Sequence, residues 1–125
     1  MSSISGYNKK SLSQVFQILE EFRKIYPDMQ MQTASVFISV ALNEGITMRE
    51  MQVRTGLTQA SCSRNVSLLS DKGKSNRNNQ AGFGLLVAKE DPEERRRKIV
   101  ILTPKGKRIA TSLASIVKGG EQHYE

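Results

Sequence analysis

The chain has 125 residues, of which 38% are hydrophobic and 25% charged, so a single folded domain over 1–125 is expected rather than a multidomain or disordered protein. Its one cysteine, Cys62, and its one histidine, His123, argue against a disulfide scaffold and a zinc cluster, and no cofactor is predicted. The single cysteine also makes the interior of a cell the expected location. No apolar run is long enough for a membrane helix, so a soluble, cytoplasmic protein is predicted, and its formal net charge is +7.

Two helices are expected in the first part of the chain. Ser11 can cap a helix that runs to about Tyr26, because apolar residues recur there at spacings of three and four and Pro27 follows. A second helix is predicted from about Thr33 to Asn43, where an apolar stripe is followed by a glycine that can end the helix.

A capping box and a glycine hinge then predict a helix-turn-helix. Thr47 is followed three residues later by Glu50, the pattern in which each side chain caps the other residue's backbone N–H. The short helix that begins here is closed by Gly56, and Thr58 is placed to cap a new helix that runs to about Lys72. Two helices joined by so short a hinge have helix-turn-helix spacing.

The second helix of this pair is expected to show an outer face of small polar residues with one arginine. At about 100° per residue, Cys62, Val66 and Leu69 fall on the apolar face. The outer face, opposite the apolar one, consists of Ala60, Ser61, Arg64 and Ser67, and it is flanked by Gln59 and Ser63. Small side chains let a backbone approach closely, while arginine can bond the guanine edge and glutamine can pair with adenine. The alternative is an ordinary amphipathic surface helix.

A loop, a hairpin and a last helix complete the chain. The polar stretch 74–83 predicts a loop, and two β-prone runs, 85–90 and 98–103, predict a hairpin that turns at Asp91-Pro92. Three consecutive arginines at 95–97 crowd its tip, which suits the narrow minor groove, although the acids at 91, 93 and 94 could simply pair with them. Thr103 and Pro104 start a helix over 104–118.

The positive charge is concentrated in one part of the sequence. Residues 47–110 contain fourteen Lys or Arg against six acids, whereas residues 1–46 are balanced and residues 111–125 carry a net −1. A surface that neutralises several phosphates needs cations gathered in this way, so the distribution favours a nucleic-acid partner over a merely solubilising surface.

Two stretches resemble the MarR family of winged helix-turn-helix regulators. Residues 47–73, TMREMQVRTGLTQASCSRNVSLLSDKG, are similar to the helix-turn-helix of that family, and residues 91–106, DPEERRRKIVILTPKG, to its wing and following helix. The chain departs from the pattern in the insertion at 74–83 and at Asn65, which stands where an apolar residue is expected. The resemblance implies a mainly α (α+β) fold, a winged helix-turn-helix with a two-stranded wing and flanking N- and C-terminal helices.

The resemblance also implies a function. It implies a sequence-specific transcriptional regulator of double-stranded DNA, expected to be a repressor. Two copies are expected to form a homodimer through their N- and C-terminal helices. The expected location is the cytoplasm of a prokaryotic or phage-infected cell, associated with the nucleoid. The recognition helix would enter the major groove and the wing the minor groove. A small-molecule effector fits the family, but no residue supports one. The implied DNA-binding residues are Thr58 as the helix cap, Gln59, Ala60, Ser61, Ser63 and Arg64 on the helix, and Arg95, Arg96 and Arg97 on the wing, with Asp91 supporting the wing by an ion pair.

Other functions and residue roles fit the sequence less well. Catalysis is not expected, because the chain has no glycine-rich phosphate loop and no serine, histidine and aspartate constellation. A winged-helix module for protein interaction or nucleoprotein assembly remains an alternative to the DNA-binding regulator, and structured RNA is a third possibility. Cys62 is interpreted as a buried core residue rather than a redox sensor, and the methionines as core residues rather than the lining of a ligand pocket.

Overall fold

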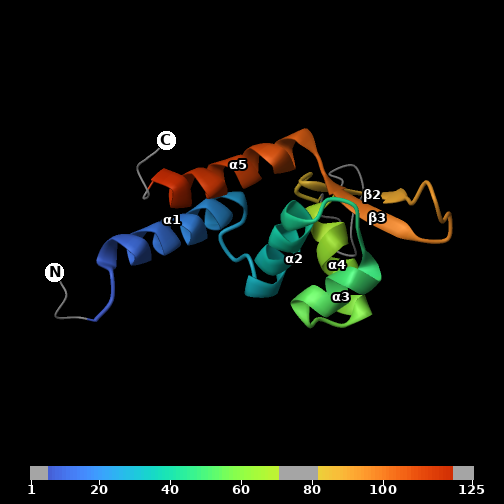
Figure 1. The fold of residues 1–125 in the computed structure, drawn as a ribbon, viewed down its shortest axis with the longest axis horizontal. Coiled ribbons are helices and arrows are strands. Elements are labelled where there is room, and N and C mark those ends of the chain that lie inside the picture. The colour runs from blue at the N-terminus through green and yellow to red at the C-terminus, as the bar shows by residue number, and fades with distance from the viewer. Residues whose placement is uncertain (1–5, 71–81, 120–125) are drawn as a thin grey trace. The chain divides into compact units, whose positions relative to one another are not determined.

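The computed structural model describes residues 6–70 and 82–119, and Figure 1 labels its helices and the two strands β2 and β3. In chain order they are α1 (Lys9–Ile25), α2 (Met31–Leu42), β1 (Ile46–Thr47), α3 (Met48–Thr55), α4 (Gln59–Leu69), β2 (Leu86–Glu90), β3 (Lys98–Leu102) and α5 (Pro104–Gly119). These elements confirm the predicted winged-helix α+β fold. Most of the predicted loop at 74–83 and the last predicted turn of α4 lie outside the described residues.

The described residues form two compact units, and the chain passes from one to the other just before α2 and again within α5. The first contains the residues up to Met29 and those from Ile109 onward, and the second is Gln30–Arg108. The second unit contains the whole helix-turn-helix and wing. A single domain over 1–125 stays a prediction. Among the described residues, no helix combines the length and apolarity needed to cross a bilayer.

Helix α1 begins earlier than the sequence predicted. Asn8, not Ser11, is its N-cap, and the Asn8 side chain accepts a hydrogen bond from the Ser11 backbone N–H at 3.0 Å. The correction has a simple cause, since asparagine caps a helix as well as serine does and stands three residues earlier. The helix buries Phe22, but four apolar side chains are 42–62% exposed: Leu12, Val15, Phe16 and Leu19.

The capping box and the glycine hinge are present as predicted. The Thr47 side chain accepts from the Glu50 N–H at 3.1 Å, and the Glu50 carboxylate accepts from the Thr47 N–H at 2.9 Å. Gly56 ends α3 in the left-handed region at φ 75°, where a glycine is favoured because it has no Cβ. Thr58 then caps α4. Helix α2 begins at Met31, slightly before the predicted Thr33.

A three-stranded antiparallel sheet completes the second unit. Strand β3 lies in the centre, with β2 on one side and β1 on the other. The β2–β3 pairing is the predicted hairpin, and its register joins Leu86 with Leu102 and Glu90 with Lys98. Strand β1 was not predicted. It is only two residues long and pairs Ile46 with Val100 and Thr47 with Ile99.

The hydrophobic core of the second unit lies where α2, α3, α4 and the sheet meet. Helix α2 packs against both α3 and α4, and also contacts β3. The most deeply buried side chains are Val36, Phe37, Val40, Met51, Cys62, Leu69, Leu85, Leu86 and Val100, each at most 1% exposed. Cys62 is therefore a core residue, as interpreted from the sequence, and Met51 is one as well. Met31, by contrast, is 72% exposed.

Candidate nucleic-acid interface

Helix α4 has a buried face and a solvent face. The buried residues are Ser61, Cys62, Asn65, Val66 and Leu69. The exposed ones are Gln59, Ala60, Ser63, Arg64 and Ser67. Thr58, also exposed, precedes the first turn and accepts a hydrogen bond from the Ser61 N–H through its hydroxyl at 3.1 Å. The structure therefore leaves all but one of the predicted α4 residues open to a ligand.

The exception is Ser61, whose predicted place on the outer face is wrong. Its exposed fraction is 8%, and its hydroxyl donates to Gln32 Oε1 on α2 at 2.7 Å. Ser61 precedes Cys62 by one position, or about 100° around the helix, and α4 is rotated so that Ser61 and Asn65 meet α2 together. Periodicity alone could not fix this rotation, because it identifies the apolar stripe but not its polar margins.

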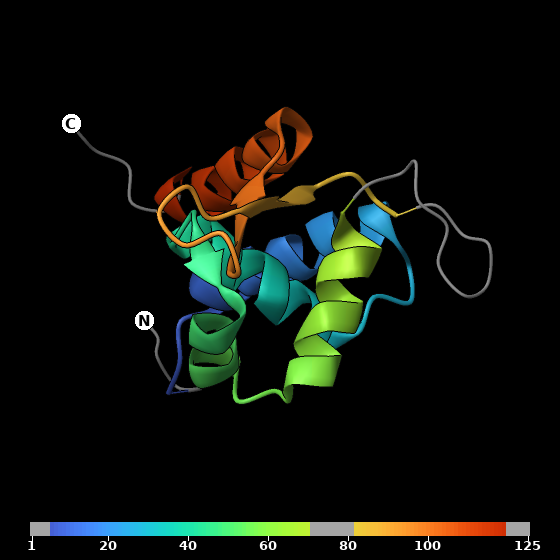
Figure 2. The same cartoon turned by 90° about the vertical axis from the view of Figure 1, so that its right-hand side faces the viewer.

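The neighbouring helix α3 adds two arginines that the sequence analysis did not single out. Arg49 and Arg54 are exposed, and α3 contacts α4. Figure 2 shows the two helices on either side of the turn that joins them. The first helix of a helix-turn-helix crosses the phosphate backbone of DNA, so exposed arginines there were the signal that could have found these positions.

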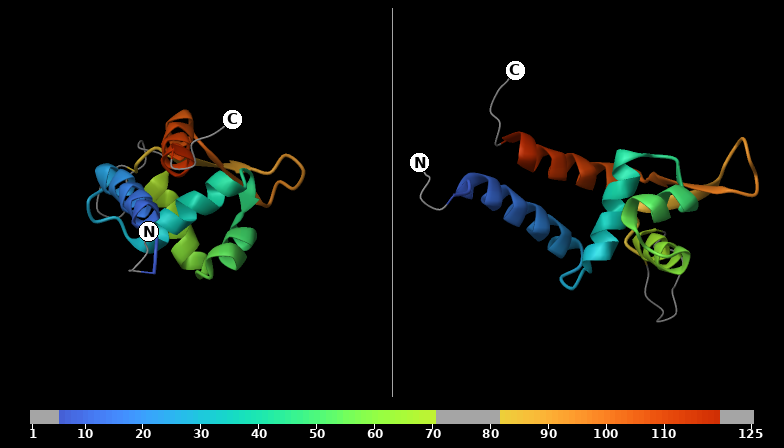
Figure 3. Two further views of the ribbon diagram at one scale, coloured as in Figure 1. Left: turned by 60° about the vertical axis from the view of Figure 1, so that its left-hand side comes forward. Right: turned by 60° about the horizontal axis from the view of Figure 1, so that its bottom comes forward.

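The wing carries two further exposed arginines. The hairpin loop is closed by a hydrogen bond from the Asp91 N–H to the Arg97 carbonyl oxygen at 2.9 Å. In the right-hand view of Figure 3 this loop extends away from α3 and α4. Arg95 and Arg96 are exposed there, and within residues 6–70 and 82–119 neither side chain has a hydrogen-bond or ion-pair partner.

Arg97 differs from its two neighbours because Asp91 holds it. Its Nε and Nη2 donate to Asp91 Oδ2 at 2.9 Å and 2.6 Å, and the other oxygen, Oδ1, accepts from the Glu93 N–H at 2.9 Å. These bonds hold the pKa of Asp91 below its ordinary value; the bond from the Glu93 N–H has the larger effect, and those from Arg97 add to it. The same contacts with Asp91 raise the pKa of Arg97.

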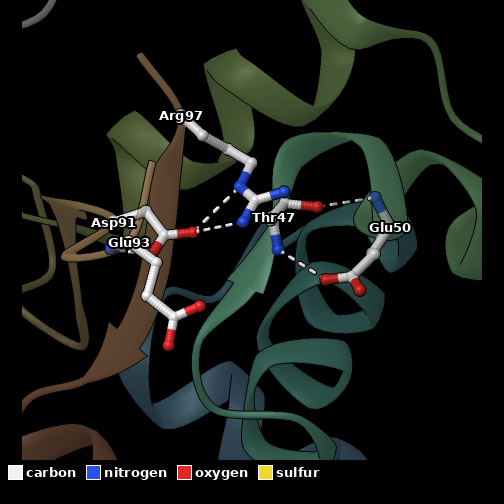
Figure 4. A network of polar contacts seen from close by, with 5 residues as sticks. All are labelled: Thr47, Glu50, Asp91, Glu93 and Arg97. Carbon is white, nitrogen blue, oxygen red and sulfur yellow. Dashed lines mark hydrogen bonds and ion pairs between the residues drawn. The ribbon is translucent and has the colours of Figure 1, made fainter. Parts of the chain in front are cut away.

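The base of the wing and the start of α3 share one cluster of charges. Figure 4 shows the Arg97 guanidinium between Asp91 and the Thr47–Glu50 capping box. The hydrogen bonds from Thr47 lower the pKa of the Glu50 carboxyl, and the positive charges of Arg54 and Arg97 lower it further. Arg97 thus lies within the electrostatic reach of carboxylates from two parts of the fold, Asp91 and Glu94 in the hairpin loop and Glu50 on α3.

The arrangement favours an anionic macromolecule as a ligand. Five exposed arginines of this surface form no hydrogen bond or ion pair through their side chains in the described part of the chain, although the charge of Arg54 acts on Glu50: Arg49, Arg54, Arg64, Arg95 and Arg96. Over the same residues, no group of three histidine, cysteine or acidic side chains is placed to hold a metal ion. Arginines spread over two helices and a hairpin suit an extended polyanion better than a small ion.

Comparison with solved structures identifies the fold. A MarR-like transcriptional regulator from Thermotoga maritima aligns over 100% of this chain and 84% of its own, with 24% identity and a TM-score of 0.63. MepR from S. aureus, solved as a DNA complex, aligns over 91% and 81%, with 19% identity and a TM-score of 0.63. BpsR from Bordetella bronchiseptica, whose DNA binding is described as regulated by 6-hydroxynicotinic acid, aligns over 98% and 81%, with 19% identity and a TM-score of 0.55.

No protein-family model and no curated protein sequence matches this chain. At identities below 25%, the solved structures bear on the fold rather than on the function. They agree with the sequence resemblance and with the observed order of helices and wing. The chain has the winged helix-turn-helix fold of MarR-like transcriptional regulators.

Proposed function

We propose that this protein is a sequence-specific transcriptional regulator that binds double-stranded DNA. The observation that carries the proposal is the exposed face of α4, which combines small side chains with Arg64, on a helix that contacts α3 and its exposed arginines. Solubility alone does not require such a face, because lysine and glutamate are better helix formers for that purpose.

In this proposal α4 enters the major groove. The groove is about 12 Å wide and admits a helix, and the small side chains of Ala60 and Ser63 let the α4 backbone approach the bases. Gln59 and Arg64 are the exposed side chains with the length and the hydrogen-bond donors to read adenine and guanine edges. Arg49 and Arg54 on α3 contact phosphates on the flank, and Thr58 keeps its role as the cap of α4.

The wing enters the neighbouring minor groove. Arg95 and Arg96 are the two arginines available to reach into it, because Arg97 is held against Asp91. Arg97 retains a 52% exposed side chain, so it contributes positive charge near the phosphates from the base of the wing. Asp91 supports the wing by fixing that arginine.

A second copy of the chain completes the proposed regulator. Leu12, Val15, Phe16 and Leu19 repeat at the helical spacing of three and four along α1, and all four are exposed. Burial of such a stripe against the N- and C-terminal helices of another copy forms a homodimer, whose two α4 helices read half-sites about 10 base pairs apart. Bound at a promoter in a prokaryotic or phage-infected cell, such a dimer acts as a repressor by excluding other proteins from the site.

Selection of bound fragments from random duplex DNA tests this proposal. We expect enrichment of a palindromic sequence with half-sites about 10 base pairs apart. The affinity for DNA should fall as the salt concentration is raised, and the fall is steeper the more phosphates the protein neutralises. An A-form RNA duplex should compete poorly, because its deep and narrow major groove excludes a helix. Recovery of no preferred sequence and no salt-dependent binding would overturn the proposal in favour of a protein-interaction module.

A further inference from the structure

Helix α4 meets α2 through polar side chains as well as apolar ones. Ser61 and Asn65 on α4 are each 8% exposed, and Thr33 on α2 is 2% exposed. Burying a polar side chain costs free energy unless it finds hydrogen-bond partners, and an apolar residue at position 65 would have packed without this cost. The presence of three such residues at one contact therefore needs a physical explanation.

The partners of these side chains form a connected network. The Thr33 hydroxyl donates to Asn65 Oδ1 at 2.6 Å, and Asn65 Nδ2 donates to the Ser61 carbonyl oxygen at 2.9 Å and to Ser61 Oγ at 3.4 Å. Ser61 Oγ donates in turn to Gln32 Oε1. We call Gln32, Thr33, Ser61 and Asn65 the α2–α4 polar cluster. Among the described residues, none of its buried side-chain polar atoms lacks a partner.

Such a network constrains α4 in a way that its apolar contacts do not. Cys62, Val66 and Leu69 gain from burial against any apolar neighbour, so their contribution changes little when the helix turns slightly about its axis. A hydrogen bond has a narrow range of length and angle, and a turn of the helix that stretches the Thr33–Asn65 bond leaves two buried polar groups unsatisfied. The cluster therefore penalises rotations that the apolar face would tolerate.

We propose that the α2–α4 polar cluster sets the rotation of α4 about its own axis and so determines which side chains the helix presents outward. Ser61 and Asn65 are then positioning residues for recognition, and they act through Gln59, Ser63 and Arg64 on the opposite face. The inference rests on the proposed function, because it assumes that this outward face reads base sequence. It adds that base discrimination depends on residues that touch no DNA.

The test replaces both ends of the buried bond together. In the double variant Thr33→Val, Asn65→Leu, apolar groups take the place of both partners, so neither group of the Thr33–Asn65 bond is left unpaired. We measure thermal melting and then the affinity for random duplex and for the sequence that the wild type selects. We expect cooperative melting, random-duplex affinity within about twofold of the wild type, and a selected-site affinity about tenfold or more lower. The control Thr33→Ser keeps the hydroxyl and should keep the discrimination.

Each outcome decides for or against the cluster. A folded double variant that discriminates as well as the wild type would show that these residues only fill the core. Should the double variant fail to fold, Thr33→Val alone breaks the bond between the helices, and here too unchanged discrimination overturns the proposal. Lowered discrimination in either folded variant, with Thr33→Ser unchanged, supports it.

A second measurement separates failure of this inference from failure of the proposed function. If the wild type itself selects no sequence, the proposed function has failed, and amide hydrogen exchange still tests the positioning role. We expect faster exchange along α4 in the double variant, with exchange in α3 unchanged. Equal exchange along α4 in both proteins would show that the cluster does not hold the helix.

Discussion

The arginines of the candidate interface differ in what holds their side chains. Arg97 is fixed by two bonds to Asp91, whereas Arg64, Arg95 and Arg96 have no partner among the described residues. A fixed guanidinium offers a constant charge, while a mobile one can reorient to meet a base edge but loses side-chain entropy on binding. We therefore expect substitutions of these arginines to have different effects on DNA binding.

Arg64→Ala should weaken binding to the selected site by about 1–3 kcal/mol and relax discrimination at one base position, because the bidentate contact to a guanine is lost. Binding titrations against the selected sequence and its single-base variants measure the effect. Arg23→Ala is the matched control, since Arg23 is an exposed arginine on α1 whose partner is Glu20. A binding profile unchanged by Arg64→Ala would show that this residue does not read a base.

Asp91→Asn should lower thermal stability at neutral pH, because the carboxylate that holds Arg97 and the Glu93 N–H is lost. The folded pKa of Asp91 lies below its ordinary value, so its stabilising effect is complete above that value and disappears as the pH falls through the folded pKa. The difference in melting temperature between wild type and variant should therefore shrink in acid, below about pH 4. Asp28→Asn, at an exposed site, is the control. A difference that stays constant from neutral pH into acid would contradict this account.

At the scale of elements, the backbone of α5 comes so close to the segment before β2 that no side chain fits at Gly106. A Cβ added at Gly106, in the first turn of α5, would overlap the carbonyl oxygen of Leu85. The same segment is fixed by a hydrogen bond from the Thr103 N–H to that oxygen at 2.9 Å and by one from the Thr103 hydroxyl to the Gly84 carbonyl oxygen at 2.6 Å. The contact is between backbones, so it cannot be relieved by a change of rotamer.

Gly106→Ala should therefore destabilise the protein, despite the higher helix propensity of alanine, by about 1–3 kcal/mol as in other overpacked sites. Urea unfolding followed by circular dichroism measures the loss. Arg108→Ala, two residues further along the same helix and exposed, should change the free energy of unfolding little. If the two variants were equally stable, the close approach at Gly106 would carry no energetic weight.

Local signals predicted most of these elements. The capping box at Thr47 and Glu50, the hinge at Gly56 and the alternation in 98–102 depend on residues close in sequence, and the structure contains all three. Strand β1 has only two residues and exists because β3 pairs with it, so no local pattern could show it. The inward position of Ser61 depends in the same way on Gln32, which lies on another helix.

At the scale of the whole molecule, the exposed stripe on α1 predicts self-association. Phe16→Glu places a charge in the middle of the stripe, where Phe16 is 62% exposed and is not one of the core residues. We expect the variant to remain folded but to sediment as a monomer, and to bind a palindromic site much more weakly than the wild type because the two half-sites are no longer linked. Analytical ultracentrifugation checks the first part and binding titrations the second. A monomeric wild type would refute the predicted dimer.

Thr47 links the sheet to the start of α3. It pairs with Ile99 in the sheet, its hydroxyl and N–H form the capping box of α3, and its capping partner Glu50 lies within the electrostatic reach of Arg97 at the base of the wing. The hairpin and α3, the first helix of the helix-turn-helix, are therefore joined at Thr47 by backbone pairing and by hydrogen bonds, so they should move together. In the proposed complex, a tilt of the wing caused by a wider or narrower minor groove would be transmitted to α3, the helix proposed to contact the adjacent phosphates. The affinity for a DNA site would then depend jointly on its minor-groove width, met by the wing, and on its base sequence, read by α4.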